Sequence, residues 1–136
     1  MNETSNATRS VVIERDIAHP PEKIWRALTQ PHLIQEWLMK NDFVPTVDHK
    51  FTLSADWGAV ECQVLIVEPD KSLSYTWAAY GLESIVTWTL TRNGKGTHLR
   101  MEQSGFKPEQ NQAYHGAQHG WQQFFGNLES VLAKLD

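Results

Sequence analysis

The chain has 136 residues, which is enough for one domain built around a single hydrophobic core. Its 12 Lys and Arg against 16 Asp and Glu give a formal net charge of −4, so it lacks the basic surface that a nucleic-acid partner would need. No apolar run approaches the roughly 20 residues that cross a bilayer, so no membrane insertion is expected. The single cysteine, Cys62, cannot form an internal disulfide, which favours a cytoplasmic location.

The first part of the chain predicts a polar leader, a strand and two short helices. Residues 1–9, "MNETSNATR", predict a flexible leader, and residues 10–136 a single domain. In "SVVIERDIAH", Val11, Ile13 and Ile17 share one face and Val12, Glu14 and Asp16 the other, as in a half-buried strand, and Arg15 shares the apolar face. "PPEKIWRALTQ" and "PHLIQEWLM" predict helices that start near Pro21 and Pro31, because proline is favoured in a first helical turn.

After Asn41 the pattern changes to that of antiparallel strands. "KFTLS" and "AVECQVLIVEP" form one pair around the turn "ADWG", and "SLSYTWAAY" follows. "ESIVTWTLTRNGKGTHLRMEQSGF" predicts a hairpin that turns at "RNGKG", with Trp88 and Met101 on the inner face and threonines facing water. Pro108 and Glu109 then open a long terminal helix. Because strands and helices are segregated, the fold class is α+β, with a curved antiparallel sheet wrapped around the terminal helix.

The terminal helix has two unlike halves. From Trp121 to Leu135 large apolar residues recur with helical spacing, and burying them favours folding. Before Trp121, Gly116 and Gly120 lie one turn apart, and each costs about 1 kcal/mol relative to alanine in a helix. Such a cost is tolerated where a ligand sits or where another backbone passes closely. The glycines therefore indicate either a cavity, which is the preferred interpretation, or close packing of the helix on the sheet.

Four segments in a fixed order resemble a known family. They are "IERDIAHPPEKIWRALTQPHLIQEW", "VEPDKSLSYTW", "VTWTL" with "GKGTHLRM", and "GWQQFFGNLESVL". Together they resemble the activator of heat shock protein 90 ATPase homologue family, part of the START-like (SRPBCC), helix-grip superfamily. The resemblance implies about seven strands gripping the C-terminal helix, two short helices after the first strand, and a hydrophobic cavity between sheet and helix.

Aromatic and small residues are expected to line that cavity. Flat rings and a thioether suit aromatic or lipid-like molecules. The alternative is that the same side chains pack together and leave no space. The candidate lining residues are Trp37, Trp77, Trp88, Met101, Gly116, Gly120, Trp121 and Phe125.

Polar candidates are few. Arg15 could anchor a ligand carboxylate, although pairing with an acid is the preferred interpretation, and Gln103 shares the inward parity of Met101. His115 and His119 have the spacing of two metal ligands on one helix face, but a site needs a third and usually a fourth, so no metal is expected. No cofactor motif, nucleophile–base pair or other catalytic set is recognisable, so no catalytic residue is assigned.

Three functions remain open at this stage. The first is non-catalytic binding of a hydrophobic small molecule, lipid-like, polyketide or aromatic, in the cavity. The second is a co-chaperone-like regulator of the heat shock protein 90 ATPase with a role in the stress response, as the family name implies. Against it, the eukaryotic activators have an additional N-terminal domain, and this chain has about ten polar residues before its first strand. The third, ranked last, is a cyclase or hydrolase of the same fold.

Overall fold

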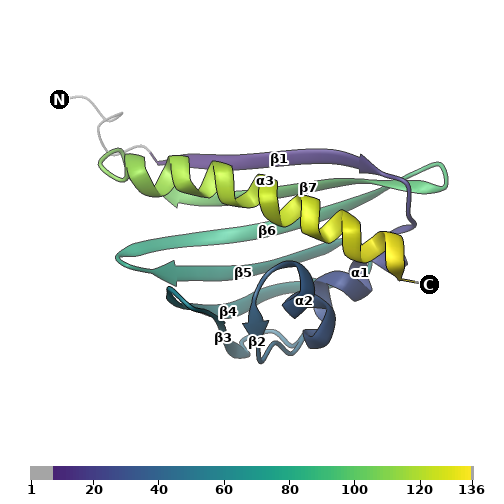
Figure 1. The fold of residues 1–136 in the computed structure, drawn as a ribbon, viewed down its shortest axis with the longest axis horizontal. Helices are drawn as coiled ribbons and strands as arrows, with labels where there is room; N and C mark the ends of the chain where they lie inside the picture. Colours follow the sequence, from purple (N-terminus) through teal and green to yellow (C-terminus); the bar gives the residue numbers. More distant parts are fainter. Residues whose placement is uncertain (1–7, 136) are drawn as a thin grey trace.

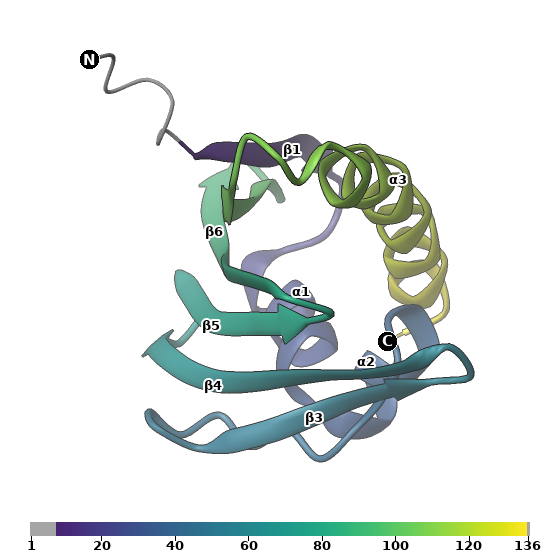
Figure 2. The same cartoon turned by 90° about the vertical axis from the view of Figure 1, so that its left-hand side faces the viewer.

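A curved seven-stranded sheet holds one long helix on its concave side in the computed structural model, which describes residues 8–135 (Figures 1 and 2). All neighbouring strands are antiparallel, in the order β1-β7-β6-β5-β4-β3-β2. The elements are β1 (Arg9–Ile17), α1 (Pro21–Thr29), α2 (Pro31–Trp37), β2 (Lys40–Asn41), β3 (Lys50–Ala55), β4 (Gly58–Glu68), β5 (Ser72–Ala79), β6 (Leu82–Asn93), β7 (Gly96–Phe106) and α3 (Asn111–Lys134). The predicted α+β helix-grip fold is confirmed.

The boundaries differ from the sequence prediction at three places. β1 begins at Arg9, so the expected leader of residues 1–9 overlaps it, and residues 1–7 lie outside the described part of the chain. β2 was not predicted, because two residues are too few to show alternation. α3 begins at Asn111 instead of Pro108, because Gln110 closes a turn before the helix. The Gln110 side-chain oxygen accepts from the backbone N–H of Lys107, and the Gln110 N–H donates to the Lys107 carbonyl.

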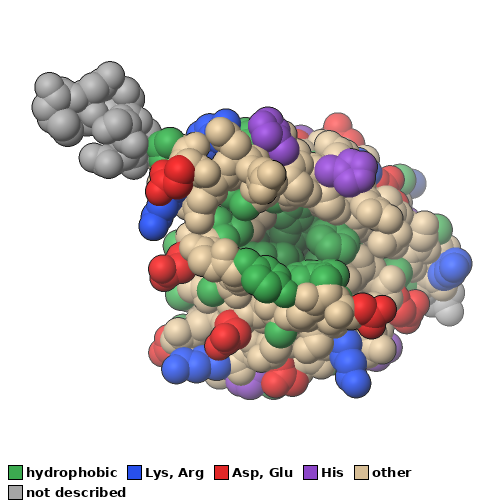
Figure 3. Space-filling view, turned by 60° about the vertical axis from the view of Figure 1, so that its left-hand side comes forward, with side chains coloured by type: hydrophobic (Ala, Val, Ile, Leu, Met, Phe, Trp, Pro, Cys, Tyr) green, Lys and Arg blue, Asp and Glu red, His purple; other side chains and the backbone are tan. Residues whose placement is uncertain are grey.

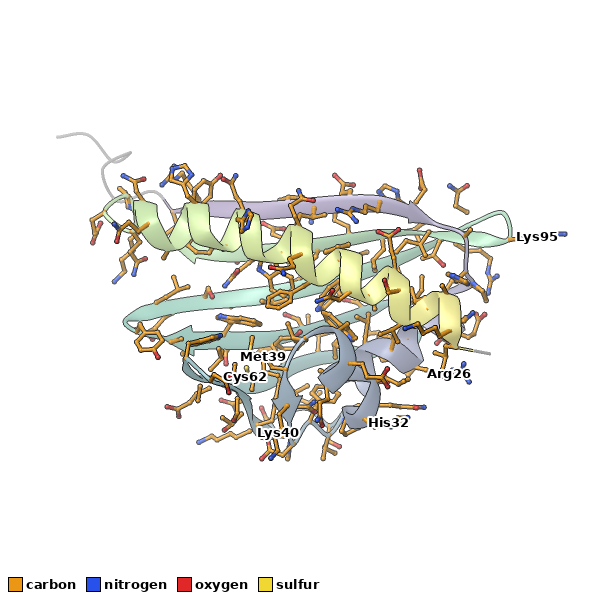
Figure 4. All side chains as sticks on the ribbon, in the orientation of Figure 1. Arg26, His32, Met39, Lys40, Cys62 and Lys95 are labelled. Carbon is orange, nitrogen blue, oxygen red and sulfur yellow. The ribbon has the colours of Figure 1, made fainter. Side chains whose placement is uncertain are left out.

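The β6–β7 hairpin turns where the sequence predicts. Asn93 pairs with Gly96, and the two-residue turn between them consists of Gly94 and Lys95, which projects at one end of the molecule (Figure 4). Gly94 has a φ of 62°, a left-handed conformation that glycine adopts without steric cost. This register places Trp88 directly opposite Met101, and both side chains are fully buried.

The second half of α3 carries the contacts that hold the helix to the sheet. Its buried residues all lie at or after Trp121 and follow the helical period, and they are Trp121, Phe125, Leu128, Val131 and Leu132. The helices α1 and α2 pack against this half of α3 as well. The first half of α3 buries none of its residues completely, and this difference positions the candidate site.

Candidate functional site

A cavity of about 330 Å³ lies between the first half of α3 and the sheet. Figure 3 shows it as a hollow in the surface with hydrophobic side chains gathered inside. Its walls come from α3, β5, β6, β7, the β3–β4 turn and the segment between α2 and β2, on which Figure 4 labels Met39. The lining residues are Met39, Trp57, Trp77, Leu82, Gln103, Ala113, Gly116, Ala117, Gly120, Trp121 and Phe124.

The helix contributes a face of minimal side chains to this cavity. Ala113, Gly116, Ala117 and Gly120 recur at the spacing i, i+3, i+4, i+7, so they share one face of α3. A Cβ atom built on Gly116 or on Gly120 would meet no other atom within 4 Å. The two glycines therefore border open space, and the alternative of close packing between helix and sheet does not apply to them.

The predicted aromatic residues do converge, but only some of them reach the cavity. Trp77 and Trp121 line it with their ring centroids 5.3 Å apart. Trp88 contacts Trp121 from behind, at 5.8 Å between centroids, and continues the cluster to Trp37 and Phe125 at 5.6 and 5.5 Å. Trp37, Trp88, Met101 and Phe125 are core residues and do not line the cavity, because all four are almost completely buried.

Gln103 lies in the cavity wall as part of a buried hydrogen-bond chain. The Trp121 indole N–H donates to its carbonyl oxygen at 2.7 Å, and its amide donates to the Ser84 hydroxyl at 2.9 Å. Ser84 in turn donates to the Trp77 carbonyl at 2.8 Å. Because indole can only donate, this chain fixes which end of the Gln103 amide faces each partner. Gln103 therefore holds the Trp121 ring in place.

Two exposed aromatic residues lie at the tips of two hairpins, and one of them, Trp57, also lines the cavity. Trp57, at the tip of the β3–β4 hairpin, is 54 % exposed, and Tyr80, at the tip of the β5–β6 hairpin, is 79 % exposed. The Tyr80 hydroxyl donates to the Trp57 carbonyl at 2.6 Å, and their ring centroids are 6.1 Å apart. This bond passes over Gly58, where any Cβ atom would collide with the Tyr80 hydroxyl. The two hairpin tips are thereby joined at Trp57, a residue that lines the cavity.

Arg15 lies outside the cavity, so it cannot anchor a ligand there. Its guanidinium donates to Glu129 at 2.5 Å and to Gln122 at 2.7 Å, and it lies 5.3 Å from the centre of the Phe125 ring. This is the pairing with an acid that the sequence analysis preferred. The contacts tie β1 to the second half of α3.

The remaining reactive residues are not gathered at the cavity. None of the residues that line it is acidic, basic or a thiol. His115 and His119 are exposed on α3, and residues 8–135 contain no group of three or more His, Cys, Asp or Glu that could hold a metal ion. Cys62 is buried on β4, and burial raises the pKa of its thiol to about 12. No helix of the described chain is long and apolar enough to cross a membrane.

Comparison with known proteins identifies the family. The sequence profile of the family described as "Activator of Hsp90 ATPase homolog 1-like protein" matches residues 18–133. The chain belongs to this family. No protein of curated function matches the sequence.

Solved structures support the family assignment and the fold. A protein from Mesorhizobium loti, MLL2253, is 62 % identical with a TM-score of 0.91, and the match covers 94 % of this chain and 99 % of that one. BH1534 from Bacillus halodurans is 27 % identical with a TM-score of 0.81, over 91 % of this chain and 96 % of that one. CalU16 from Micromonospora echinospora has the same fold, with 23 % identity, a TM-score of 0.82 and coverage of 94 % and 78 %.

Sequence reasoning did not identify several cavity residues. Ala113 and Ala117 could have been found, since they extend the spacing of Gly116 and Gly120 along one helix face. Trp57 also gave a signal, because a large apolar residue is unusual within a hairpin turn. Met39, Leu82 and Phe124 gave no comparable signal, because the cavity is formed by elements distant in sequence.

Proposed function

We propose that this protein binds a hydrophobic small molecule, without chemical conversion, in the cavity beneath the first half of α3. The observation that carries the proposal is the small-residue face of α3, which lines the cavity together with Trp77 from the sheet. A helix that only packed on the sheet would gain stability from larger side chains at Gly116 and Gly120, where space is open. The cavity volume, about 330 Å³, lies at the lower end of the range usual for ligand pockets.

The absence of ionisable groups from the cavity lining supports binding over catalysis. General acid–base or nucleophilic chemistry requires a titratable or nucleophilic side chain within hydrogen-bond reach of the substrate. Gln103 is the one lining residue among those described that carries a side-chain amide, and its contacts with Trp121 and Ser84 are structural. An apolar cavity with few polar groups instead favours reversible burial of an apolar molecule.

Filling the cavity from the helix tests this function. Gly120→Leu places a side chain in the cavity, whereas Gly126→Leu makes the same change at an exposed position of α3 that does not line it. Naphthalene and a panel of flavonoid-like and polyketide-like aromatic compounds are titrated while tryptophan fluorescence and amide chemical shifts are followed. We expect binding to the wild type and to Gly126→Leu, and its loss in Gly120→Leu. No response of the wild type to the whole panel would refute the proposal.

Regulation of a chaperone ATPase is a second candidate, favoured by the family match and by the exposed Trp57 and Tyr80. Aromatic residues of this kind are enriched in protein interfaces. The test measures the ATPase rate of the host's own heat shock protein 90 with and without the protein. An unchanged rate, together with no binding in a pull-down, would remove this candidate.

A further inference from the structure

Trp77 differs from the other buried tryptophans in its hydrogen bonding. The indole N–H of Trp37 donates to the Ala27 carbonyl at 2.8 Å, and that of Trp88 to the Tyr75 hydroxyl at 3.1 Å. Trp121 donates to Gln103 at 2.7 Å. Within residues 8–135 the Trp77 indole N–H has no such partner, although only 8 % of the residue is exposed. A buried indole N–H normally finds an acceptor, so this one requires an explanation.

The unpaired N–H belongs to a residue of the cavity wall. No fully buried side-chain nitrogen or oxygen among the described residues lacks a partner, so the Trp77 N–H retains some accessible surface. Trp77 lies on β5 among the inward-facing residues and lines the cavity opposite the small-residue face of α3. Because Trp77 is only 8 % exposed and lines this cavity, a molecule bound in the cavity is the candidate to supply the acceptor that the N–H lacks.

The rest of the lining restricts what kind of molecule can supply that acceptor. Gln103 already accepts a hydrogen bond from Trp121 and donates one to Ser84, so both ends of its amide are paired with residues of the protein. No lining residue carries a charge. Burying a carboxylate or phosphate without a cation is strongly unfavourable, so anions are excluded. The rings of Trp77 and Trp121, 5.3 Å apart, offer flat surfaces for aromatic contact.

We infer that the ligand is an uncharged aromatic molecule with an oxygen acceptor, such as a ketone, quinone or ether, that accepts a hydrogen bond from the Trp77 indole N–H. This inference rests on the proposed binding function and defines its ligand class. A pure hydrocarbon would displace water from the N–H and leave it unpaired, which is the costly outcome for a buried donor. The acceptor therefore selects among molecules that fit the cavity equally well.

Three naphthalene derivatives of nearly equal shape separate these contributions. 2-Acetylnaphthalene carries a neutral acceptor, 2-isopropylnaphthalene replaces it with hydrocarbon, and 2-naphthoate carries an anion. Calorimetry gives each Kd for the wild type and for Trp77→Phe, which keeps an aromatic ring but lacks the donor. We expect Trp77→Phe to weaken the ketone about tenfold relative to the hydrocarbon, the value of one well-formed hydrogen bond. The quantity compared between variants is the ratio of the ketone Kd to the hydrocarbon Kd. The two compounds differ in hydration, but this difference is the same for every variant and therefore cancels.

Trp57→Phe is the matched control, because Trp57 also lines the cavity but is largely exposed to solvent. It should leave the ketone-to-hydrocarbon ratio unchanged. In the wild type the ketone should also move the indole N–H resonance of Trp77, a readout that does not depend on any variant folding. An unmoved resonance with bound ketone, an equal ratio in Trp77→Phe, or tightest binding of 2-naphthoate would overturn the inference while leaving cavity binding intact. Failure of all three compounds to bind would overturn both.

Discussion

Replacing Gln103 with methionine tests whether the buried hydrogen-bond chain stabilises the cavity wall. The substitution keeps the length of the side chain but removes the acceptor of the Trp121 N–H and the donor to Ser84. Trp121 is 2 % exposed, so its N–H would be left unpaired, at a cost of about 1–3 kcal/mol. Losing the bond to Ser84 adds about 0.5–1 kcal/mol, since Ser84 still donates to Trp77. The free energy of unfolding should fall by about 1.5–4 kcal/mol.

Urea denaturation of a double-mutant cycle measures this coupling. In the double variant Gln103→Met with Trp121→Phe no unpaired indole donor remains. It should therefore be less destabilised than the sum of the two single variants, by about 1–2 kcal/mol. Gln123→Met, at an exposed position of α3, serves as the control for introducing methionine. A loss below about 0.5 kcal/mol for Gln103→Met, or strict additivity in the cycle, would show that water in the cavity replaces the amide and would refute the reasoning.

Two further predictions concern titratable side chains away from the cavity. Burial raises the pKa of the Cys62 thiol to about 12. In the native protein this thiol should therefore react with a disulfide reagent about 1,000-fold more slowly than after unfolding, because the thiolate is the reactive form. A rapid reaction of the native protein would contradict the burial of Cys62. His98 contacts Glu14 at 2.8 Å and Asp16 at 2.9 Å. Both hydrogen bonds raise the pKa of His98, and the bond to Glu14 has the larger effect. A raised pKa stabilises the fold below the ordinary value of about 6.5, and the effect is lost as pH rises through the native pKa. His98→Gln should therefore destabilise the protein at about pH 5.5 and less at about pH 9 in urea titrations, and an equal loss at both would exclude this mechanism.

The fold could be predicted from sequence because its signals are local. Alternation in the β6–β7 segment, the turn at Gly94 and the prolines at the two helix starts each fix one element independently of the others. The register then follows, because shifting a strand by one residue would expose Trp88 and bury its polar neighbours. β2 and the exact start of α3 were not predicted, since both depend on contacts between few residues.

The cavity was only partly predictable, because the sequence pattern separates inward-facing from outward-facing residues but does not separate residues that line the cavity from residues of the core. Alternation shows that the side chains of Trp77 and Trp88 both face inward. It does not show which of the two borders the cavity and which is covered by other side chains. Trp121 contacts both rings, but only Trp77 lines the cavity, whereas Trp88 is fully buried. The same limit applies to Arg15, whose inward parity is right but whose position along β1 places it beside Glu129.

The face of α3 formed by Ala113, Gly116, Ala117 and Gly120 places four of the residues that limit the volume of the cavity on a single stretch of main chain. The tryptophan cluster and the apolar residues from Trp121 onward form the buried core, and of these four positions only Ala113 and Ala117 pack against it, both partly buried. Exchanging one of them for a larger residue would shrink the chamber in a graded way and leave the architecture untouched. Under the proposed function, the first half of α3 would set which molecules fit, while the second half supplies most of the contacts that hold the helix to the sheet.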